Sequence, residues 1–92
     1  MELIFRPKFL RELRSTGNKE LAVQLNFIFR QIEQASSVNE IGGLVKLRNY
    51  SHFYRIRIKI SDTRDYRFVL TVRNNKVWAE SIALASKIFY KK

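Results

Sequence analysis

The chain contains no cysteine and only one histidine, His52. Without cysteine, neither a disulfide framework nor a thiolate nucleophile is available. A single histidine excludes a histidine-rich metal cluster and a pair of histidines for acid–base catalysis. We therefore expect no metal ion and no cofactor, so any chemistry must come from other side chains.

Long hydrophobic runs are also absent. No segment approaches the roughly 20 apolar residues that a membrane helix needs. Residues 1–13 lack the apolar stretch and the small-residue cleavage site of a secretory signal. We expect a single cytoplasmic domain over residues 1–92 that does not contact a membrane. A chain of this size buries only about 60–65 % of its unfolded surface, so its core should be thin.

Acidic residues are scarce, and the imbalance of charge is uneven along the chain. Eighteen Lys and Arg stand against eight Asp and Glu, for a net charge of +10. Residues 1–45 hold six basic and five acidic residues, whereas residues 46–92 hold twelve and three. A field of this kind recruits polyanions, which predicts that the second half binds nucleic acid. A need for solubility alone, or an acidic protein partner, would account for the same field.

The N-terminal third has the pattern of a short strand followed by two helices. Residues 2–5 form an apolar run, and Pro7 suits the first turn of a helix that ends near residue 16. Gly17 suits the position after a helix, and Asn18 suits the N-cap of a second helix over about 19–35. Apolar residues recur in this second helix with helical spacing, which predicts a buried stripe of Leu21, Leu25, Ile28 and Ile32.

From residue 52 onwards the apolar period becomes two. Strands are predicted over about 52–60, 66–73 and 76–83, and Asn74 and Asn75 tolerate the positive φ of a tight hairpin turn. Residues 36–51 contain two adjacent glycines and are interpreted as a connector. The order of elements predicts an α+β fold. An N-terminal strand and a helical hairpin should pack on a twisted antiparallel sheet of about four strands.

Cations and apolar residues alternate along the first of these strands. The apolar set, Tyr54, Ile56, Ile58 and Ile60, should face the core. The cations between them should share an open face with basic residues of the next strand, which gives the set Arg55, Arg57, Arg67 and Arg73. Like charges across a sheet repel, and a bound polyanion would relieve that repulsion. A face that is merely solvated is the alternative.

The basic residues around this face are the candidates for nucleic-acid binding. They are Lys46, Arg48, Arg55, Arg57, Lys59, Arg64, Arg67 and Arg73. Other roles remain open for some residues of this region. Arg67 could pair with Asp65 or Asp62 to fix the turn, and Trp78 could be a core residue, a dimer contact or a platform for a stacked base.

Three short motifs resemble the RelE/ParE superfamily, the toxins of type II toxin–antitoxin systems. They are "YRIRI" at 54–58, "DYR" at 65–67 and the aromatic end "IFY" at 88–90, and the resemblance extends to the helical hairpin before the sheet. It implies a cytoplasmic protein that a cognate antitoxin neutralises. RelE-like members cleave mRNA on the ribosome and inhibit translation, whereas ParE-like members poison DNA gyrase.

The resemblance also implies an active site that needs no metal. Arg55 and Arg57 match basic positions of the family's strand, Arg67 matches the Arg of the next strand, and Tyr90 matches the C-terminal Tyr. Lys59, Lys87 or Tyr90 would assist or act as the general base, because Arg stays protonated. The chain departs from the family in a longer first hairpin, and in Ala85 and Ser86, which replace a basic pair. A ParE-like gyrase inhibitor and a non-catalytic nucleic-acid-binding relative are the alternatives.

Overall fold

The computed structural model describes residues 1–85 and contains two helices and five strands in that range. The helices are α1 (Pro7–Thr16) and α2 (Lys19–Gln34), and a short 3₁₀ turn, η1, covers Val38–Glu40. The strands are β1 (Glu2–Phe5), β2 (Leu44–Lys46), β3 (Phe53–Ser61), β4 (Arg64–Arg73) and β5 (Lys76–Leu84). The predicted α+β class is confirmed, and each predicted helix and strand is present within two residues of its expected bounds.

All five strands form one sheet in the order β1-β5-β4-β3-β2. The pairs β2–β3, β3–β4 and β4–β5 are antiparallel, but β1 runs parallel to β5. The sheet is therefore mixed and has five strands, where an antiparallel sheet of about four was expected. Parallel neighbours need a long crossover connection. The helical hairpin that follows β1 begins this crossover, and the hairpins of the meander then bring β5 beside β1.

The strand that the sequence did not reveal is β2, within the segment 36–51 that was interpreted as a connector. It has only three residues and follows Gly42 and Gly43, so no alternation is long enough to be recognised. Its pairing partner decides its conformation, because Leu44 lies opposite Ile56 and Lys46 lies opposite Tyr54 on β3. Gly43 has a φ of 74°, a conformation that glycine adopts at little cost.

Local signals at the helix and hairpin ends act as the sequence predicts. Gly17 ends α1 in the left-handed conformation, with a φ of 56°. The side chain of Asn18 caps α2 by accepting a hydrogen bond of 2.9 Å from the Leu21 amide. Asn74 and Asn75 both have positive φ in the turn between β4 and β5. These residues therefore set where each element begins and ends.

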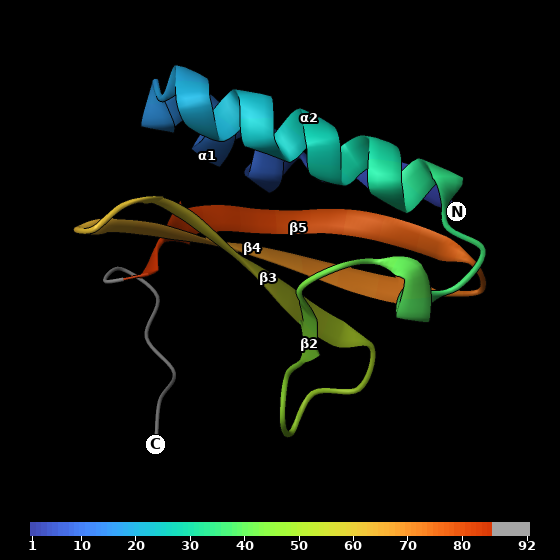
Figure 1. Ribbon diagram of the computed structural model, residues 1–92. Coiled ribbons are helices and arrows are strands. Elements are labelled where there is room, and N and C mark those ends of the chain that lie inside the picture. Colours follow the sequence, from blue (N-terminus) through green and yellow to red (C-terminus); the bar gives the residue numbers. More distant parts are fainter. Residues whose placement is uncertain (86–92) are drawn as a thin grey trace.

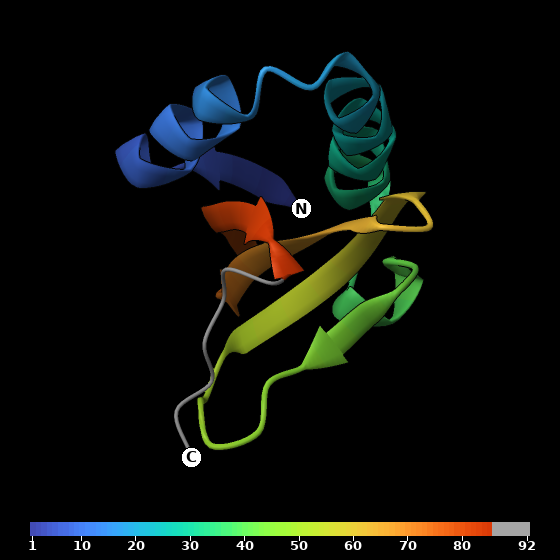
Figure 2. The ribbon, with the colours of Figure 1, turned by 90° about the vertical axis from the view of Figure 1, so that its left-hand side faces the viewer.

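Both helices cover the same face of the sheet, as Figures 1 and 2 show. The core between the layers contains an aromatic cluster in which Phe9 of α1 and Phe29 of α2 contact Phe68 of β4, with ring centroids 5.4 and 6.0 Å from it. Three residues of the predicted stripe of α2, Leu21, Leu25 and Ile32, are fully buried there. Neither helix in residues 1–85 has the length and apolarity that crossing a membrane requires.

Candidate nucleic-acid interface

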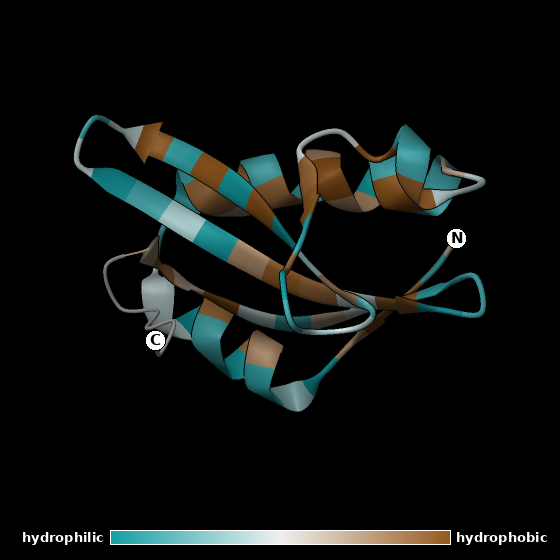
Figure 3. Cartoon of the chain, turned by 90° about the horizontal axis from the view of Figure 1, so that it is seen from below, coloured by the Kyte–Doolittle hydropathy of each residue, from teal (hydrophilic) through white to brown (hydrophobic). Residues whose placement is uncertain are grey.

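The face of the sheet opposite the helices carries the cations of β3. Ile56 and Ile58 are 4 % and 2 % exposed and point into the core, which confirms the predicted alternation. Arg55, Arg57 and Lys59 therefore point to the other side. Figure 3 shows this alternation as bands of hydrophilic and hydrophobic residues along the strand.

Strand β4 adds a fourth cation, because Arg67 is the direct cross-strand partner of Arg57. We refer to Arg55, Arg57, Lys59 and Arg67 as the basic cluster. Val69 lies opposite Arg55, so the cluster is centred on the pair of guanidinium groups at 57 and 67. Cations at directly opposed positions repel, so a nearby counter-charge or a bound anion would stabilise this pair.

Asp65 supplies part of that counter-charge. The Nε of Arg57 donates a hydrogen bond of 2.7 Å to Oδ2 of Asp65, and its Nη2 contacts the same oxygen. The other carboxylate oxygen, Oδ1, is buried and has no hydrogen-bond partner among residues 1–85. Arg57 is thus held in a fixed orientation by a carboxylate that the sequence had offered only as a partner for Arg67. The alternation along the strand could have predicted that Asp65 lies on the face of the basic cluster, because Asp65 precedes Arg67 by two residues.

The extra residues between the two strands lengthen the strands rather than the turn. β3 continues to Ser61 and β4 begins at Arg64, so only Asp62 and Thr63 form the turn. A bulge between Lys59 and Ser61 accommodates the odd residue. Lys59 lies 4.0 Å from Asp62, with both side chains largely exposed. The longer hairpin therefore leaves Arg67 opposite Arg57.

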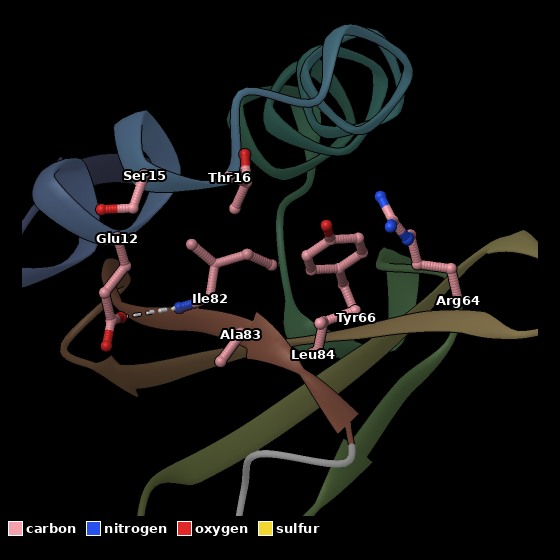
Figure 4. Close-up of a pocket in the computed structure, with 8 residues that line it drawn as sticks. All are labelled: Glu12, Ser15, Thr16, Arg64, Tyr66, Ile82, Ala83 and Leu84. Carbon is pink, nitrogen blue, oxygen red and sulfur yellow. Dashed lines mark hydrogen bonds between the residues drawn. The ribbon is translucent and has the colours of Figure 1, made fainter.

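Arg64 lies on the opposite side of the hairpin from the basic cluster. It shares its side of β4 with Tyr66, which is buried in the core. Figure 4 shows Arg64 and Tyr66 rising from the strand toward the helices, where they line a cavity of about 360 Å³ with Glu12. Glu12 accepts a hydrogen bond of 3.0 Å from the Ile82 amide there, which ties α1 to β5.

Three other candidate residues also lie apart from the basic cluster. Arg73 is six residues beyond Arg67 along β4, which places it about 20 Å away at the far end of the sheet. Lys46 and Arg48 line a shallow depression in the loop between β2 and β3. The basic surface foreseen from the sequence is thus divided into a compact cluster and separate peripheral cations.

The last strand contributes no cation to the cluster within the described residues. Ser81 lies opposite Val69, and Ala83 lies opposite Arg67. The predicted roles of Lys87 and Tyr90 fall on residues outside the described range 1–85, as does the departure at Ser86. Within residues 1–85 this part of the sheet therefore carries four cations and one carboxylate that orients Arg57.

A second group of side chains lies on the same face, at the other end of the sheet. Thr71 of β4 lies between Phe53 of β3 and Trp78 of β5, and its hydroxyl donates a hydrogen bond of 2.8 Å to Glu80. The Nε of Arg6 donates to both oxygens of Glu80, at 3.3 and 3.2 Å. The sequence analysis did not single out Arg6 or Glu80. Glu80 shares this face with Trp78, two residues before it, and is the extra residue where the register of β5 against β4 shifts.

Comparisons with known proteins give no match for this chain, either among protein-family models or among curated proteins. Its function therefore has to be inferred from its residues and their arrangement.

Proposed function

We propose that this protein is the toxin of a type II toxin–antitoxin system, a RelE-type endoribonuclease that cleaves mRNA on the ribosome and thereby inhibits translation. The observation that carries the proposal is the basic cluster, in which Arg57 and Arg67 are directly opposed on an open sheet face. Single-stranded RNA in the ribosome offers an anionic backbone that such a face can bind. The proposal also includes a cytoplasmic location and a cognate antitoxin as protein partner.

The guanidinium pair suits the charge that develops in RNA cleavage. When a 2′-hydroxyl attacks the adjacent phosphorus, negative charge builds on the phosphate oxygens. Guanidinium groups hold such oxygens with paired, charge-assisted hydrogen bonds. Because Asp65 already orients Arg57, less conformational freedom is lost when a phosphate binds. Positioning and electrostatic stabilisation therefore favour a mechanism without a metal ion.

The proposed step balances without an external reagent. A bond forms between the 2′-oxygen and phosphorus, and the bond from phosphorus to the 5′-oxygen breaks, leaving a cyclic phosphate and a 5′-hydroxyl. The 2′-proton passes to a general base, and the departing 5′-oxygen receives a proton. Lys59, two residues beyond Arg57 on the same face, and Tyr90 are the candidates for base, and Lys87 is a further residue that would assist.

A second candidate function is ParE-like inhibition of DNA gyrase, an activity that needs binding but no chemistry. The feature that favours it is the composition of β5 beside the cluster, where Ser81 and Ala83 stand opposite β4. A binding surface tolerates the small, uncharged residues of this strand better than a catalytic site does. Supercoiling by purified gyrase, measured with and without this protein, separates the two functions.

Translation in a cell-free extract tests the leading proposal. The wild-type protein should reduce synthesis of a reporter protein. For Arg57→Gln and for Arg67→Gln, the concentration that halves this synthesis should be at least tenfold higher. Arg30→Gln is the matched control, since it removes the same charge from an exposed position of α2 and should inhibit as the wild type does. Undiminished synthesis with the wild-type protein would sink the proposal. Inhibition of gyrase in its place would favour the second candidate.

The partner is tested through the genome. A short reading frame that encodes an acidic, partly helical protein should neighbour the gene for this chain. Expression of this chain alone should arrest growth, and co-expression of the neighbour should restore it. Growth that is unaffected by this chain in cells that lack the neighbour would contradict the toxin proposal.

A further inference from the structure

We propose that the group around Thr71 forms a pocket for a single nucleobase, with guanine as the preferred base. A cavity of about 250 Å³ lies there and is lined by Arg6, His52, Phe53, Thr71, Arg73, Trp78 and Glu80. This volume lies below the roughly 300–1,000 Å³ of sites for drug-sized ligands, so it suits one base rather than a dinucleotide. We refer to these seven residues as the base pocket. The inference rests on the proposed function only in taking RNA as the polymer.

The walls of the base pocket are aromatic, and their spacing follows from the register of the sheet. Phe53 and Trp78 both lie opposite Thr71, one on each neighbouring strand. Strands two apart in a sheet are separated by about 9–10 Å, which leaves room for a planar ring above the small Thr71. Thr71 is only 8 % exposed although it lies on the face away from the helices, because larger side chains surround it. The three residues thus make two walls and a floor.

The polar groups of the base pocket are a carboxylate and a guanidinium. Glu80 receives two donors, the Arg6 Nε and the Thr71 hydroxyl. A carboxylate has about four lone-pair sites, so acceptor capacity remains for a ligand. The Glu80 side chain is 22 % exposed, and a ligand in the cavity can reach it. Arg6 uses only its Nε in this ion pair and stacks on Trp78, with Cζ 5.6 Å from the ring centroid.

This pair of charged groups matches the edge of guanine. Guanine presents two adjacent N–H donors, on its ring nitrogen N1 and its exocyclic amine, next to the acceptor O6. A carboxylate can accept from both donors, and a neighbouring guanidinium can donate to the oxygen. Adenine, cytosine and uracil do not offer two adjacent donors beside an acceptor. Glu80 and Arg6 therefore select guanine, while Phe53 and Trp78 provide stacking that any base would use.

The base pocket and the basic cluster lie along the same strand. Phe53 precedes Arg57 by four residues of β3, a distance of about 13 Å. Arg73 lines the pocket as an exposed cation, and His52 lines it beside Phe53. An RNA strand can thus place one base in the pocket while phosphates further along it contact the cluster. The pocket would then give the protein a sequence preference that the cluster alone cannot supply.

The single tryptophan of the chain provides a direct readout. In an NMR titration, the indole N–H signal of Trp78 should shift and saturate with guanosine monophosphate. The apparent Kd should be at least tenfold lower than with the adenosine, cytidine or uridine monophosphates. In Glu80→Gln this preference should fall to less than threefold, and in Phe53→Leu the affinity for all four should fall about tenfold. Arg30→Gln should behave as the wild type does.

Other outcomes would overturn the proposal. They are a Trp78 signal that does not saturate with any nucleotide, equal affinities for all four, a guanine preference that persists in Glu80→Gln, and an unchanged affinity in Phe53→Leu. Saturation by inorganic phosphate at the same concentration would also contradict it, because the site would then bind phosphate alone. The amide spectrum of each variant shows whether it is folded. If Glu80→Gln does not fold, Phe53→Leu still tests the pocket independently. The titration needs neither ribosomes nor cleavage, so its failure is distinguishable from failure of the endonuclease.

Discussion

At the scale of single residues, the orientation of Arg57 is the feature that most affects the proposed chemistry. Its partner Asp65 is the one carboxylate that contacts it within residues 1–85, at 2.7 Å. The Arg57 side chain is 63 % exposed and that of Asp65 20 % exposed. Pairs of this kind add only about 0–1 kcal/mol to stability. The contact therefore contributes little to folding, and in the proposed function it orients the guanidinium toward a phosphate.

The variant Asp65→Asn separates binding from catalysis. Removal of one negative charge should leave RNA affinity equal or higher, because the cluster becomes more positive. Cleavage should fall at least tenfold, because Arg57 is no longer held in place. The measurements are RNA binding by fluorescence anisotropy and single-turnover cleavage on ribosomes. A variant that loses affinity and cleavage in equal proportion would contradict this role for Asp65.

The salt dependence of RNA binding tests whether the cluster contacts phosphates. Each lost contact with a single strand should lower the slope of log affinity against log salt by about 0.7. Arg57→Gln and Arg67→Gln should each show this change with a single-stranded RNA oligomer. Arg64→Gln is a useful control from the same hairpin, because Arg64 points toward the helices. An unchanged slope in the two cluster variants, or an equal change in all three, would argue against the cluster as the contact surface.

At the scale of elements, the hairpin of β3 and β4 is the part that the sequence predicts best. Alternation of isoleucine with cations gives both the strand and its faces, because a residue's neighbour two positions away shares its side. The same rule places Arg64 beside Tyr66, on the side away from Arg67. The prediction that grouped Arg64 with the other cations used its charge and overlooked its position in the strand.

The features that the sequence did not predict, the strand β2 and the parallel direction of β1, depend on the strands that pair with them. β2 is a strand because β3 lies beside it, and β1 is parallel because β5 returns to its side. The contact of Glu80 with Arg6 and Thr71 depends on how β1, β4 and β5 pair. The conformational preferences of three or four neighbouring residues do not determine such pairings. Composition and periodicity therefore could not predict that the residues of the proposed base pocket come together.

The start of α2 gives a prediction about stability at this scale. Asn18→Ala removes the cap that accepts from the Leu21 amide and should lower the free energy of unfolding by about 1 kcal/mol. The measurement is urea denaturation followed by circular dichroism. Asn26→Ala, at an exposed position within the same helix, should not destabilise, because alanine is the better helix former. Equal losses in the two variants would show that the cap is not the cause.

At the scale of the whole molecule, the two faces of the sheet differ in the side chains that they carry. One is covered by α1 and α2 (Figures 1 and 2) and packs on the apolar core. The other carries the basic cluster toward one end and the residues of the base pocket toward the other. The net charge of +10 predicted a polyanion as partner, but it could not say which cations lie together. The sheet decides that, because it gathers four cations near one end and leaves Lys46, Arg48, Arg64 and Arg73 elsewhere.

The central claim is that the basic cluster acts on mRNA in the ribosome, and mapping of mRNA 5′ ends tests it most directly. Purified ribosomes that translate a defined message should yield new 5′-hydroxyl ends at discrete positions within the reading frame when the wild-type protein is added. Ribosome-free RNA should yield none, and Arg57→Ala and Arg67→Ala should reduce the ends at least a hundredfold, while Arg30→Ala retains them. A message that stays intact on ribosomes with the wild-type protein, or is cut equally by the Arg57 and Arg67 variants, would contradict the account.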